Sequence, residues 1–337
     1  MSRQLKRKQF LSSRGLQDAQ ITPLVPDASA RRYFRLQLGD DTMMLMDAPP
    51  PGEKPGAFIQ VTSYLEKLGA RVPHVIASDV QTGLVLLEDL GDQTMTSLLA
   101  QGADETTLYR QAVDALVQMQ QAFSAADMEI SLPAYDLDAA LAEADLMVEW
   151  YLPARLLRRL DQQEHREFRE IWTSLFHSLP DMSPVLVHRD FHVDNLLIVE
   201  GACAMLDYQD ALLGSPLYDL VSLLEDARRD VDVGLQQQLI ERWQATQNIE
   251  RETFTRHFTF WGAQRHCKVA GIFVRLWLRD HKNGYLGHLP RVMDLLKRNL
   301  EPAFMTPLKD WLTARLPKIN HQELGNNPDT LRRIVMD

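Results

Sequence analysis

Three oxygen-bearing side chains stand at fixed intervals in the second half of the sequence. Asp190 follows His188-Arg189, Asn195 lies five residues later (195 − 190), and Asp207 comes after twelve more (207 − 195). Phosphoryl transfer requires positioning and charge neutralisation more than covalent chemistry. Asp190 can accept the proton of an attacking hydroxyl, and Asn195 and Asp207 offer the hard oxygen ligands that Mg²⁺ prefers. The spacing predicts a site for magnesium-dependent phosphoryl transfer from ATP.

Short apolar runs around this motif predict how it is held. Residues 185–187 and 196–199 read as buried strands, and another run over 202–206 follows the tight turn Glu200-Gly201. The two runs that flank the turn predict a β-hairpin, which folds Asp207 back toward Asn195. The alternative is a chance match in an exposed loop, and the agreement between motif and hairpin argues against it.

The order of the elements predicts an α+β fold. Residues 33–38 and 42–46 read as two strands around a turn, residues 57–68 have helical spacing, and residues 85–88 read as a further strand. After residue 106 the pattern is mainly helical, with amphipathic segments near 106–124, 138–150, 164–178, 217–229, 233–246 and 253–280.

This order divides the chain into two predicted lobes. We expect a small β-rich N-lobe with one helix over residues 1–90 and a large helical C-lobe over residues 91–337, joined near 88–95. With 337 residues, 45% of them hydrophobic and 24% charged, the chain is long enough for each lobe to bury a core.

The composition also excludes several classes of protein. No apolar run approaches the roughly 18 residues of a membrane span, and the basic start over 1–8 lacks the apolar stretch of a signal peptide. We expect a cytoplasmic protein that binds no membrane. The net charge of −10 argues against a general nucleic-acid surface, so ATP must find a local cationic pocket. No obligate protein partner is evident in the sequence.

The two cysteines, Cys203 and Cys267, lie in apolar or helical contexts without the spacing of a disulfide framework or a zinc site. Both are expected to be reduced packing residues. His266 precedes Cys267, but adjacent positions on a helix point about 100° apart and chelate one ion poorly. This pair is therefore interpreted as core packing.

The motifs together resemble the aminoglycoside-phosphotransferase-like branch of the protein-kinase-like fold. The resemblance is carried by residues 27–35, 87–91 and 279–285 in addition to the catalytic motif, and it covers nearly the whole chain. Within the branch, the likeness is strongest to the bacterial anomeric kinases of N-acetylmuramate and N-acetylglucosamine. It implies a two-lobe protein-kinase-like fold, ATP and Mg²⁺ as cofactors, and a small amino sugar as substrate.

The resemblance implies particular roles in the N-lobe. Ser29, Arg31 and Arg32 would form the turn of the hairpin that covers the phosphates, and the backbone from Glu88 to Leu90 would hydrogen-bond adenine at the hinge between the lobes. A solvated loop is the alternative for the two arginines, because charged turns are common.

One departure from the family concerns the strand lysine that kinases pair with a helical glutamate. The expected strand, residues 43–46, offers methionine instead, and the helix after it has Phe58 and Gln60 where a glutamate would stand. The phosphate contacts are therefore expected to come partly from Arg31, Arg32 or Arg35.

Several residues around the catalytic motif have more modest predicted roles. Residues 214–220 resemble the family segment that begins a helix behind the loop. Asp219 in this segment is expected to accept hydrogen bonds from the backbone or from His188, so both are interpreted as structural support. Asp210 is either a partner of the metal ligands or an exposed acid. His192 and Asp194 are either substrate contacts or surface positions.

Two segments are candidates for binding the sugar. Glu149 and Trp150 offer a carboxylate and a ring face at a predicted helix end, although core packing is the alternative. The basic segment 265–282 ends with Arg275, Arg279 and Lys282. Arg275 and Arg279 are four apart, so they project from one side of a helix and would bind the lactyl carboxylate of N-acetylmuramate. A solvated helix face is the alternative.

The preferred hypothesis is an ATP-dependent kinase that phosphorylates the anomeric C1 hydroxyl of N-acetylmuramate and N-acetylglucosamine for peptidoglycan recycling. A phosphotransferase for another hydroxyl acceptor, such as an aminoglycoside or choline, is the alternative within the enzymes. A non-catalytic nucleotide-binding scaffold of kinase fold is the alternative outside them, and the presence of Asp190, Asn195 and Asp207 disfavours it.

Overall fold

The computed structural model describes residues 2–25, 31–316, 324 and 327–336. The chain forms two compact units. The first contains residues 1–132 and 190–211, and the second contains residues 133–189 and 212–337. The predicted catalytic motif is divided between them, because His188 and Arg189 belong to the second unit and Asp190 to the first. The predicted lobe boundary near residue 90 stays a prediction.

A five-stranded antiparallel sheet organises the first unit. Its strands run in the order β1-β2-β3-β5-β4, and the two predicted strands 33–38 and 42–46 pair as β2 and β3 with Phe34 opposite Leu45. The strands are β1 (Gln20–Pro23), β2 (Arg32–Leu38), β3 (Asp41–Asp47), β4 (Val75–Asp79) and β5 (Leu84–Glu88). The small antiparallel sheet expected from the sequence is confirmed.

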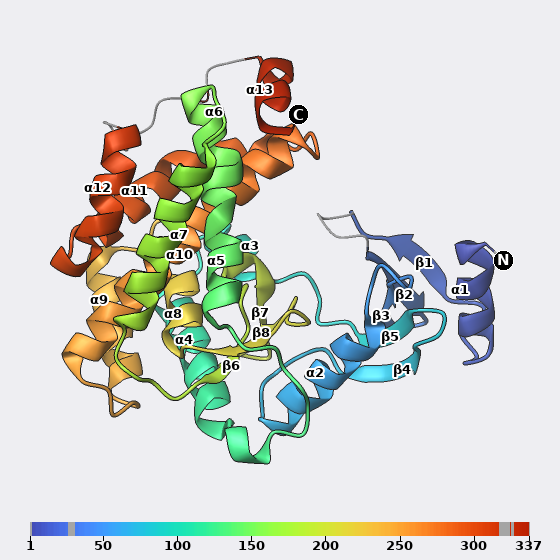
Figure 1. Ribbon diagram of the computed structural model, residues 1–337. Coiled ribbons are helices and arrows are strands. Elements are labelled where there is room, and N and C mark those ends of the chain that lie inside the picture. The colour runs from blue at the N-terminus through green and yellow to red at the C-terminus, as the bar shows by residue number, and fades with distance from the viewer. Residues whose placement is uncertain (1, 26–30, 317–323, 325–326, 337) are drawn as a thin grey trace. The chain divides into compact units, whose positions relative to one another are not determined.

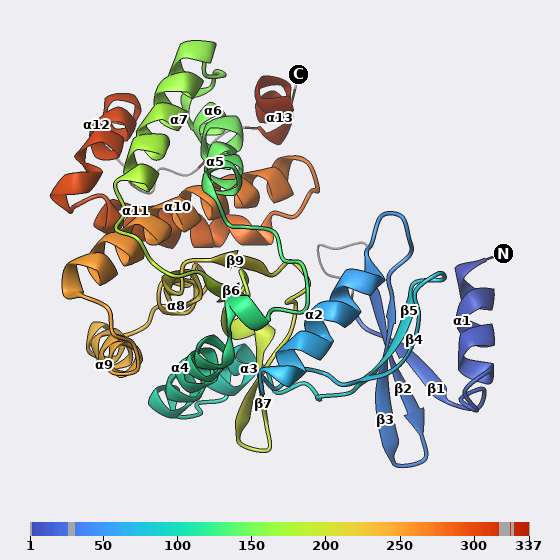
Figure 2. The same ribbon diagram turned by 60° about the horizontal axis from the view of Figure 1, so that its bottom comes forward.

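Two helices flank this sheet, α1 (Arg3–Ser12) on one side and α2 (Pro55–Lys67) on the other (Figure 2). Phe10 and Leu11 of α1 pack in a core with Leu36, Leu45 and Leu86 of the sheet. The sequence analysis predicted α2 but not α1, because the basic residues of α1 leave only a narrow apolar face. Two more helices of this unit are α3 (Met95–Ala100) and α4 (Glu105–Ala122).

The predicted catalytic hairpin is present in the first unit. Strands β7 (Leu196–Val199) and β8 (Ala202–Met205) pair antiparallel around Glu200-Gly201, and both residues of the turn have positive φ. Beyond the last ladder pair, the Leu206 N–H donates to the Asn195 carbonyl at 2.8 Å. This bond closes the base of the hairpin, so the residues at its two ends, Asn195 and Asp207, are held near each other.

The second unit is largely helical (Figure 1). A short antiparallel pair, β6 (Val185–Val187) with β9 (Leu212–Gly214), is its only sheet among the described residues. Its α-helices are α5 (Leu137–Leu146), α6 (Leu152–Leu156), α7 (Gln162–His177), α8 (Leu217–Leu224), α9 (Val233–Gln244), α10 (Arg251–Leu278), α11 (Leu289–Asn299), α12 (Thr306–Arg315) and α13 (Pro328–Met336).

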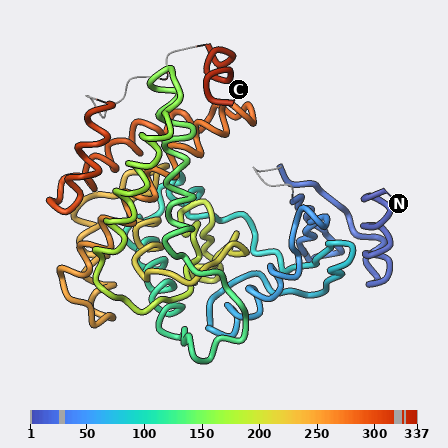
Figure 3. The backbone as a smooth tube through the Cα atoms, in the orientation of Figure 1, coloured from blue at the N-terminus to red at the C-terminus, as the bar shows by residue number. Residues whose placement is uncertain are grey.

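Helix α10 forms the centre of the second unit. Its apolar side chains join one large core that also contains residues of α5, α7, α11 and α12. The tube view shows α5 in green beside α10 in orange, although more than a hundred residues separate them in sequence (Figure 3). Cys267 is fully buried in this core and Cys203 is buried in the hairpin, so their expected packing roles are confirmed.

The segment between α5 and α6 departs from the predicted continuous helix over 138–150. Residues Met147–Tyr151 form a π-helix, in which the Leu152 N–H donates to the Met147 carbonyl five residues earlier. Pro153 follows directly. A proline inside a helix clashes with the carbonyl four residues before it, and the wider turn relieves this conflict. A single-residue π insertion of this kind is frequent at functional sites.

The helix predicted over 217–229 is shorter in the structure, because α8 ends at Leu224. The Asp226 carboxylate accepts a hydrogen bond from the Arg228 N–H at 3.0 Å. Such a local contact competes with the helical hydrogen bonds and turns the chain out of the helix. The prediction was wrong at this end for that reason.

No helix in the described part of the chain is long and apolar enough to cross a membrane.

Helices α5 and α10 approach closely at Gly271. A Cβ atom there would stand 2.2 Å from the carbonyl oxygen of Leu146, so the close contact requires glycine. We expect Gly271→Ala to lower the free energy of unfolding by about 1–3 kcal/mol through overpacking, against a gain in helix propensity of about 1 kcal/mol. Chemical denaturation measures this difference.

Gly56→Ala in α2 is the matched control for this prediction. A Cβ atom at Gly56 would meet only the Val80 side chain at an ordinary 3.7 Å, so the alanine should be neutral or stabilising. Equal stability changes in the two variants would show that the α5–α10 contact tolerates a methyl group.

Candidate active site

A cavity of about 450 Å³ lies in the first unit beside β2, β3, β5 and the catalytic hairpin. Apolar side chains form much of its wall, and charged side chains also line it. Its lining includes Arg31, Tyr33, Met44, Leu87, Asn195 and Asp207. A partly apolar cavity with a few convergent polar groups is typical of a small-molecule site.

Asn195 and Asp207, the two predicted metal ligands, both line this cavity. The Asn195 Nδ2 donates to the Asp190 carbonyl at 2.9 Å. This bond fixes the amide so that its Oδ1 oxygen is left to act as a ligand. Tyr208, next to Asp207, is held by stacking on Phe58 of α2 at 5.4 Å and by a 2.9 Å hydrogen bond to Thr62.

The charge on Asp207 is held in an unfavourable setting. Desolvation raises the pKa of its carboxyl group, and the nearby carboxylates of Asp190 and Asp210 raise it further, while Arg31 acts in the opposite direction. Asp207 also has a positive φ of 62°, a conformation that costs energy for a residue other than glycine. A cation bound there would offset the repulsion among the three carboxylates.

The donor set fits a magnesium ion held mainly by its nucleotide. The part of the chain that the structure describes has no group of three His, Cys, Asp or Glu side chains that could form a complete metal cage. Mg²⁺ normally keeps waters and is bound through one or two protein oxygens together with phosphates. Asn195 and Asp207 supply such oxygens.

The predicted hinge residues also line the cavity. The Glu88 carboxylate is engaged by both Nη atoms of Arg71, at 2.7 and 2.5 Å, so the side chain is committed to this pair and only the backbone is left for a base. Leu90 lines the same wall. Arg35 binds Asp89 at 2.6 Å and Asp92 at 2.7 Å, which ties β2 to the hinge.

Arg31 is the arginine that lies beside Asp207, one of the two predicted metal ligands. Its Nη2 lies 3.5 Å from Asp207 Oδ1, and its Nε lies 3.3 Å from Glu53 Oε2. Glu53 precedes α2, five residues before Phe58 (58 − 53). This chain therefore has an arginine paired with a carboxylate at the cavity, whereas it lacks the strand lysine and helical glutamate that kinases pair.

The other residues proposed for phosphate contacts are placed differently. Arg32 is exposed and is not among the residues that line the cavity. Arg35 lines it but is paired with the hinge carboxylates. Ser29 lies outside the described residues.

The remaining polar residues in and after the loop differ in their exposure to solvent. His192 is buried, whereas Asp194 accepts a hydrogen bond from Thr96 of α3. Asp210 is exposed and lines a smaller cavity of about 190 Å³ together with Arg31 and Glu53. This smaller cavity is lined by the Arg31 pair, which favours a role for Asp210 near the predicted metal ligands over that of an isolated surface acid.

The loop residues in the second unit are held by Asp219. Its carboxylate, which is 1% exposed, accepts hydrogen bonds from the backbone N–H of His188 at 2.7 Å and of Arg189 at 2.9 Å. Arg189 has a positive φ of 80°. The two backbone donors therefore point at one acceptor in the first turn of α8, immediately before Asp190.

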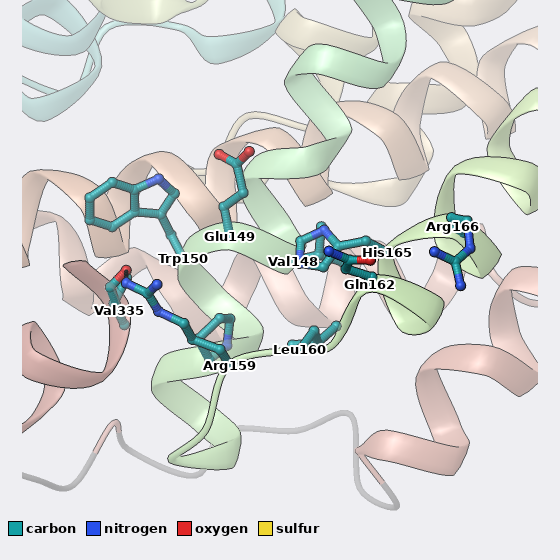
Figure 4. A pocket seen from close by; sticks show the side chains of 10 residues that line it. Val148, Glu149, Trp150, Arg159, Leu160, Gln162, His165, Arg166 and Val335 are labelled. Carbon is teal, nitrogen blue, oxygen red and sulfur yellow. Dashed lines mark hydrogen bonds between the residues drawn. The ribbon is translucent and has the colours of Figure 1, made fainter. Parts of the chain in front are cut away.

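Glu149 and Trp150 line a second cavity, of about 710 Å³, in the second unit (Figure 4). It is also lined by Arg159, His165 and Val335 of α13. Trp150 is partly buried and packs against the core of the second unit, so the structure gives it both a core contact and a place in the lining of this cavity.

The basic segment of α10 faces two environments. Arg275 is partly buried, and its Nε has no hydrogen-bond partner among the described residues. Burial and the neighbouring Arg279 lower the pKa of Arg275, and it interacts electrostatically with Glu149. Arg279 binds Asp280 at 2.8 Å, and Lys282 is partly buried.

The first residues of that segment are not on a solvated face. Arg265 and Lys268 are 5% and 6% exposed and lie close to Arg189 and Glu143. The sequence analysis did not identify Glu143 or Glu53. The i, i+3 spacing of Arg265 and Lys268, which puts both on one helix face, is a signal that could have indicated a buried carboxylate partner.

The position of Arg31 leads to a prediction for ATP binding. Arg31→Ala should weaken binding of magnesium-ATP by about tenfold or more, because a charge-assisted contact is worth about 1.5–3 kcal/mol. Isothermal titration calorimetry measures the dissociation constant. Arg32→Ala, at the adjacent exposed arginine, is the comparison. An equal loss of magnesium-ATP affinity in both variants would show that the position of Arg31 in the cavity does not explain the effect.

Comparison with known proteins gives the family. Residues 20–254 match the phosphotransferase enzyme family. The chain is 38% identical to an N-acetylmuramate/N-acetylglucosamine kinase of Pseudomonas aeruginosa, over 83% of each chain. It is 35% identical to the enzyme of that name from Neisseria meningitidis, over 88% of this chain and 91% of that one.

Solved structures show the same fold at low sequence identity. A choline kinase from Streptococcus pneumoniae is 12% identical, with a TM-score of 0.61 over 88% of this chain and 99% of that one. An ADP-bound aminoglycoside phosphotransferase is 14% identical, with a TM-score of 0.57 over 86% and 96%. The protein-kinase-like fold predicted from the sequence is confirmed. The chain belongs to the phosphotransferase enzyme family and, within it, to the family of the N-acetylmuramate/N-acetylglucosamine kinases, and it is an ATP-dependent sugar kinase.

Proposed function

We propose that this kinase transfers the γ-phosphoryl group of ATP to the anomeric C1 hydroxyl of N-acetylmuramate and N-acetylglucosamine. The observation that carries the proposal is the joint presence of Asp190, Asn195 and Asp207 in a chain that is 38% identical to a kinase named for these two sugars. The products are ADP and the sugar 1-phosphate.

In the proposed reaction, Asp190 accepts the proton of the C1 hydroxyl. The C1 oxygen forms a bond to the γ-phosphorus as the bond to the ADP oxygen breaks. An anomeric hydroxyl is more acidic than an ordinary alcohol, so orientation and weak basicity suffice. The bond from Asn195 Nδ2 to the Asp190 carbonyl supports this role, because it fixes the base and a metal ligand with respect to each other.

Asn195 and Asp207 are proposed to hold Mg²⁺, and Arg31 to contact the phosphates. The ion, when bound, neutralises charge on the β- and γ-phosphates. The backbone from Glu88 to Leu90 is the proposed adenine contact, which the apolar wall of the 450 Å³ cavity supports. His188 and Asp219 are proposed as structural support of the loop.

A sugar 1-phosphate made from free cell-wall sugars would serve peptidoglycan recycling, and such a role would place the enzyme in the cytoplasm. The small-molecule acceptor is the only partner that the proposal needs. Aminoglycosides or choline stay the alternative acceptors. The solved structures named for them share only the fold with this chain, and a shared fold does not identify the acceptor.

The position of transfer is tested with blocked sugars. Free N-acetylglucosamine and N-acetylmuramate should yield a C1 phosphate by ³¹P NMR, whereas their methyl glycosides should be inert because the C1 oxygen has no proton to lose. Asp190→Asn, which keeps the shape but removes the base, is the control and should abolish the C1 signal while ATP still binds. Phosphorylation of a methyl glycoside at another hydroxyl would contradict the C1 assignment.

The lactyl carboxylate of N-acetylmuramate is proposed to bind at Arg275, near Glu149 and Trp150. Arg275→Ala should lower kcat/KM for N-acetylmuramate by about tenfold or more relative to N-acetylglucosamine, as expected for a lost charge-assisted bond of about 1.5–3 kcal/mol. Arg279→Ala, whose side chain is paired with Asp280, and Lys282→Ala are the comparisons. An unchanged ratio in all three variants would place the carboxylate elsewhere.

A further inference from the structure

Both backbone polar groups of Arg189, the residue before Asp190, form hydrogen bonds. The Arg189 backbone N–H donates to Asp219 at 2.9 Å, and its carbonyl accepts from Arg265 Nη1 at 3.0 Å. With φ at 80°, the conformation is one that residues other than glycine adopt at a cost. Such a conformation persists only when the surrounding contacts over-determine it.

The side chain of Arg189 is held as well. Its Nε and Nη2 both donate to Glu143 Oε1, at 2.9 and 2.5 Å. Lys268 Nζ lies 2.9 Å from the same oxygen. The other oxygen of Glu143 accepts from Tyr135 Oη and from Gln264 Nε2. Four residues thus donate to one carboxylate.

Glu143 keeps its negative charge in this setting. It is 7% exposed, and burial by itself would raise the pKa of its carboxyl group, but Lys268 and Arg189 outweigh burial and hold that pKa at about 2. A buried carboxylate is tolerated when it is paired and its hydrogen bonds are satisfied. These contacts satisfy both oxygens of the Glu143 carboxylate.

The network joins three helices at one loop. Glu143 comes from α5, Gln264 and Lys268 come from α10, and Tyr218 comes from α8. The Tyr218 hydroxyl accepts from Arg265 and from Lys268, each at 3.3 Å. Asp219, the next residue on α8, holds the backbone. None of these groups is among the residues proposed above to contact ATP, magnesium or the sugar.

We propose that Glu143 is a positioning residue for phosphoryl transfer. Its carboxylate, fixed by Lys268 and Tyr135, holds the Arg189 side chain and so maintains the left-handed backbone from which Asp190 follows. Losing it would leave the substrates bound but the base misplaced. This inference rests on the proposed role of Asp190 as the base.

The first test is Glu143→Gln, which keeps the size of the side chain and removes its charge. The expected result is a fall in kcat of about tenfold to hundredfold, since small displacements of a catalytic group have effects of this size, with the KM for ATP and for the sugar changed less than about threefold. A matching rise in both KM values with kcat preserved would overturn the proposal.

The second test separates the Arg189 side chain from its backbone. Glycine adopts a positive φ without strain, so Arg189→Gly would be fully active if only the backbone conformation mattered. The proposal expects Arg189→Gly to lose kcat as Glu143→Gln does, and Arg189→Lys to retain more activity than Arg189→Gly. The double variant Glu143→Gln/Arg189→Gly should be no worse than either single variant. A fully active glycine variant, or additive losses, would overturn it.

Glu164→Gln is the matched control. Glu164 on α7 also binds two arginines, Arg158 at 2.7 Å and Arg315 at 3.1 Å, but neither belongs to the loop. It should lower stability without changing kcat. An equal fall in kcat in the control would show that Glu143 acts through general stability.

Hydrogen exchange separates failure of this inference from failure of the proposed function. The backbone amides of His188 and Arg189 should exchange faster in Glu143→Gln and in Arg189→Gly than in the parent. Their exchange rates should be unchanged in Glu164→Gln. This readout holds even if the parent phosphorylates neither sugar. Unchanged exchange in both loop variants would overturn the positioning role.

Discussion

The catalytic loop has no secondary structure of its own over 188–190, so its geometry depends on the buried carboxylate of Asp219. Two consecutive backbone N–H groups converge on it, and a carboxylate in the first turn of a helix is itself favoured by the helix dipole. This arrangement fixes the loop to α8, a helix whose residues are all buried. The second end of the loop is fixed by the hairpin, through the bond between Leu206 and Asn195.

The electrostatics of the site contrast with the composition. The chain carries a net charge of −10, yet each unit has cations at a defined place: Arg31 lies beside the predicted metal ligand Asp207 in the first unit, and Arg189, Arg265 and Lys268 lie close together in the second. Partners of opposite charge accompany Arg31, Arg189 and Lys268, because an unpaired charge taken from water is costly. Net charge therefore says little about a site whose cations are positioned one by one.

The sequence predicts the parts of the site that lie close together along the chain. Asp190, Asn195 and Asp207 are linked by a hairpin whose turn residues are recognisable, so motif and element could be inferred together. The choice among Arg31, Arg32 and Arg35 could not, because alternation along a strand gives the face of a side chain but not its partner. Arg35 is bound by Asp89 and Asp92, more than fifty residues away.

The partners of Arg189 escaped the sequence analysis for a related reason. Glu143 is 46 positions from Arg189 (189 − 143) and Lys268 is 79 positions beyond it (268 − 189), and no local pattern connects residues on three helices. The sequence analysis also treated the basic run over 265–282 as one group. In the structure, Arg265 and Lys268 lie near Arg189 and Glu143, whereas Arg275 interacts with Glu149. The end of α8 was missed because Asp226 stops the helix through a contact that periodicity does not report.

The π-helix between α5 and α6 makes one helical segment serve two surfaces. In an uninterrupted α-helix, positions 143 and 150 are seven residues and nearly two turns apart, so they would share a face. One inserted residue shifts everything after it by about 100°. Glu143 thus points into the charged network while Trp150 lines the cavity of Figure 4. Substitutions in the wall of that cavity can therefore change its shape without moving the carboxylate nearly two turns earlier in the same segment.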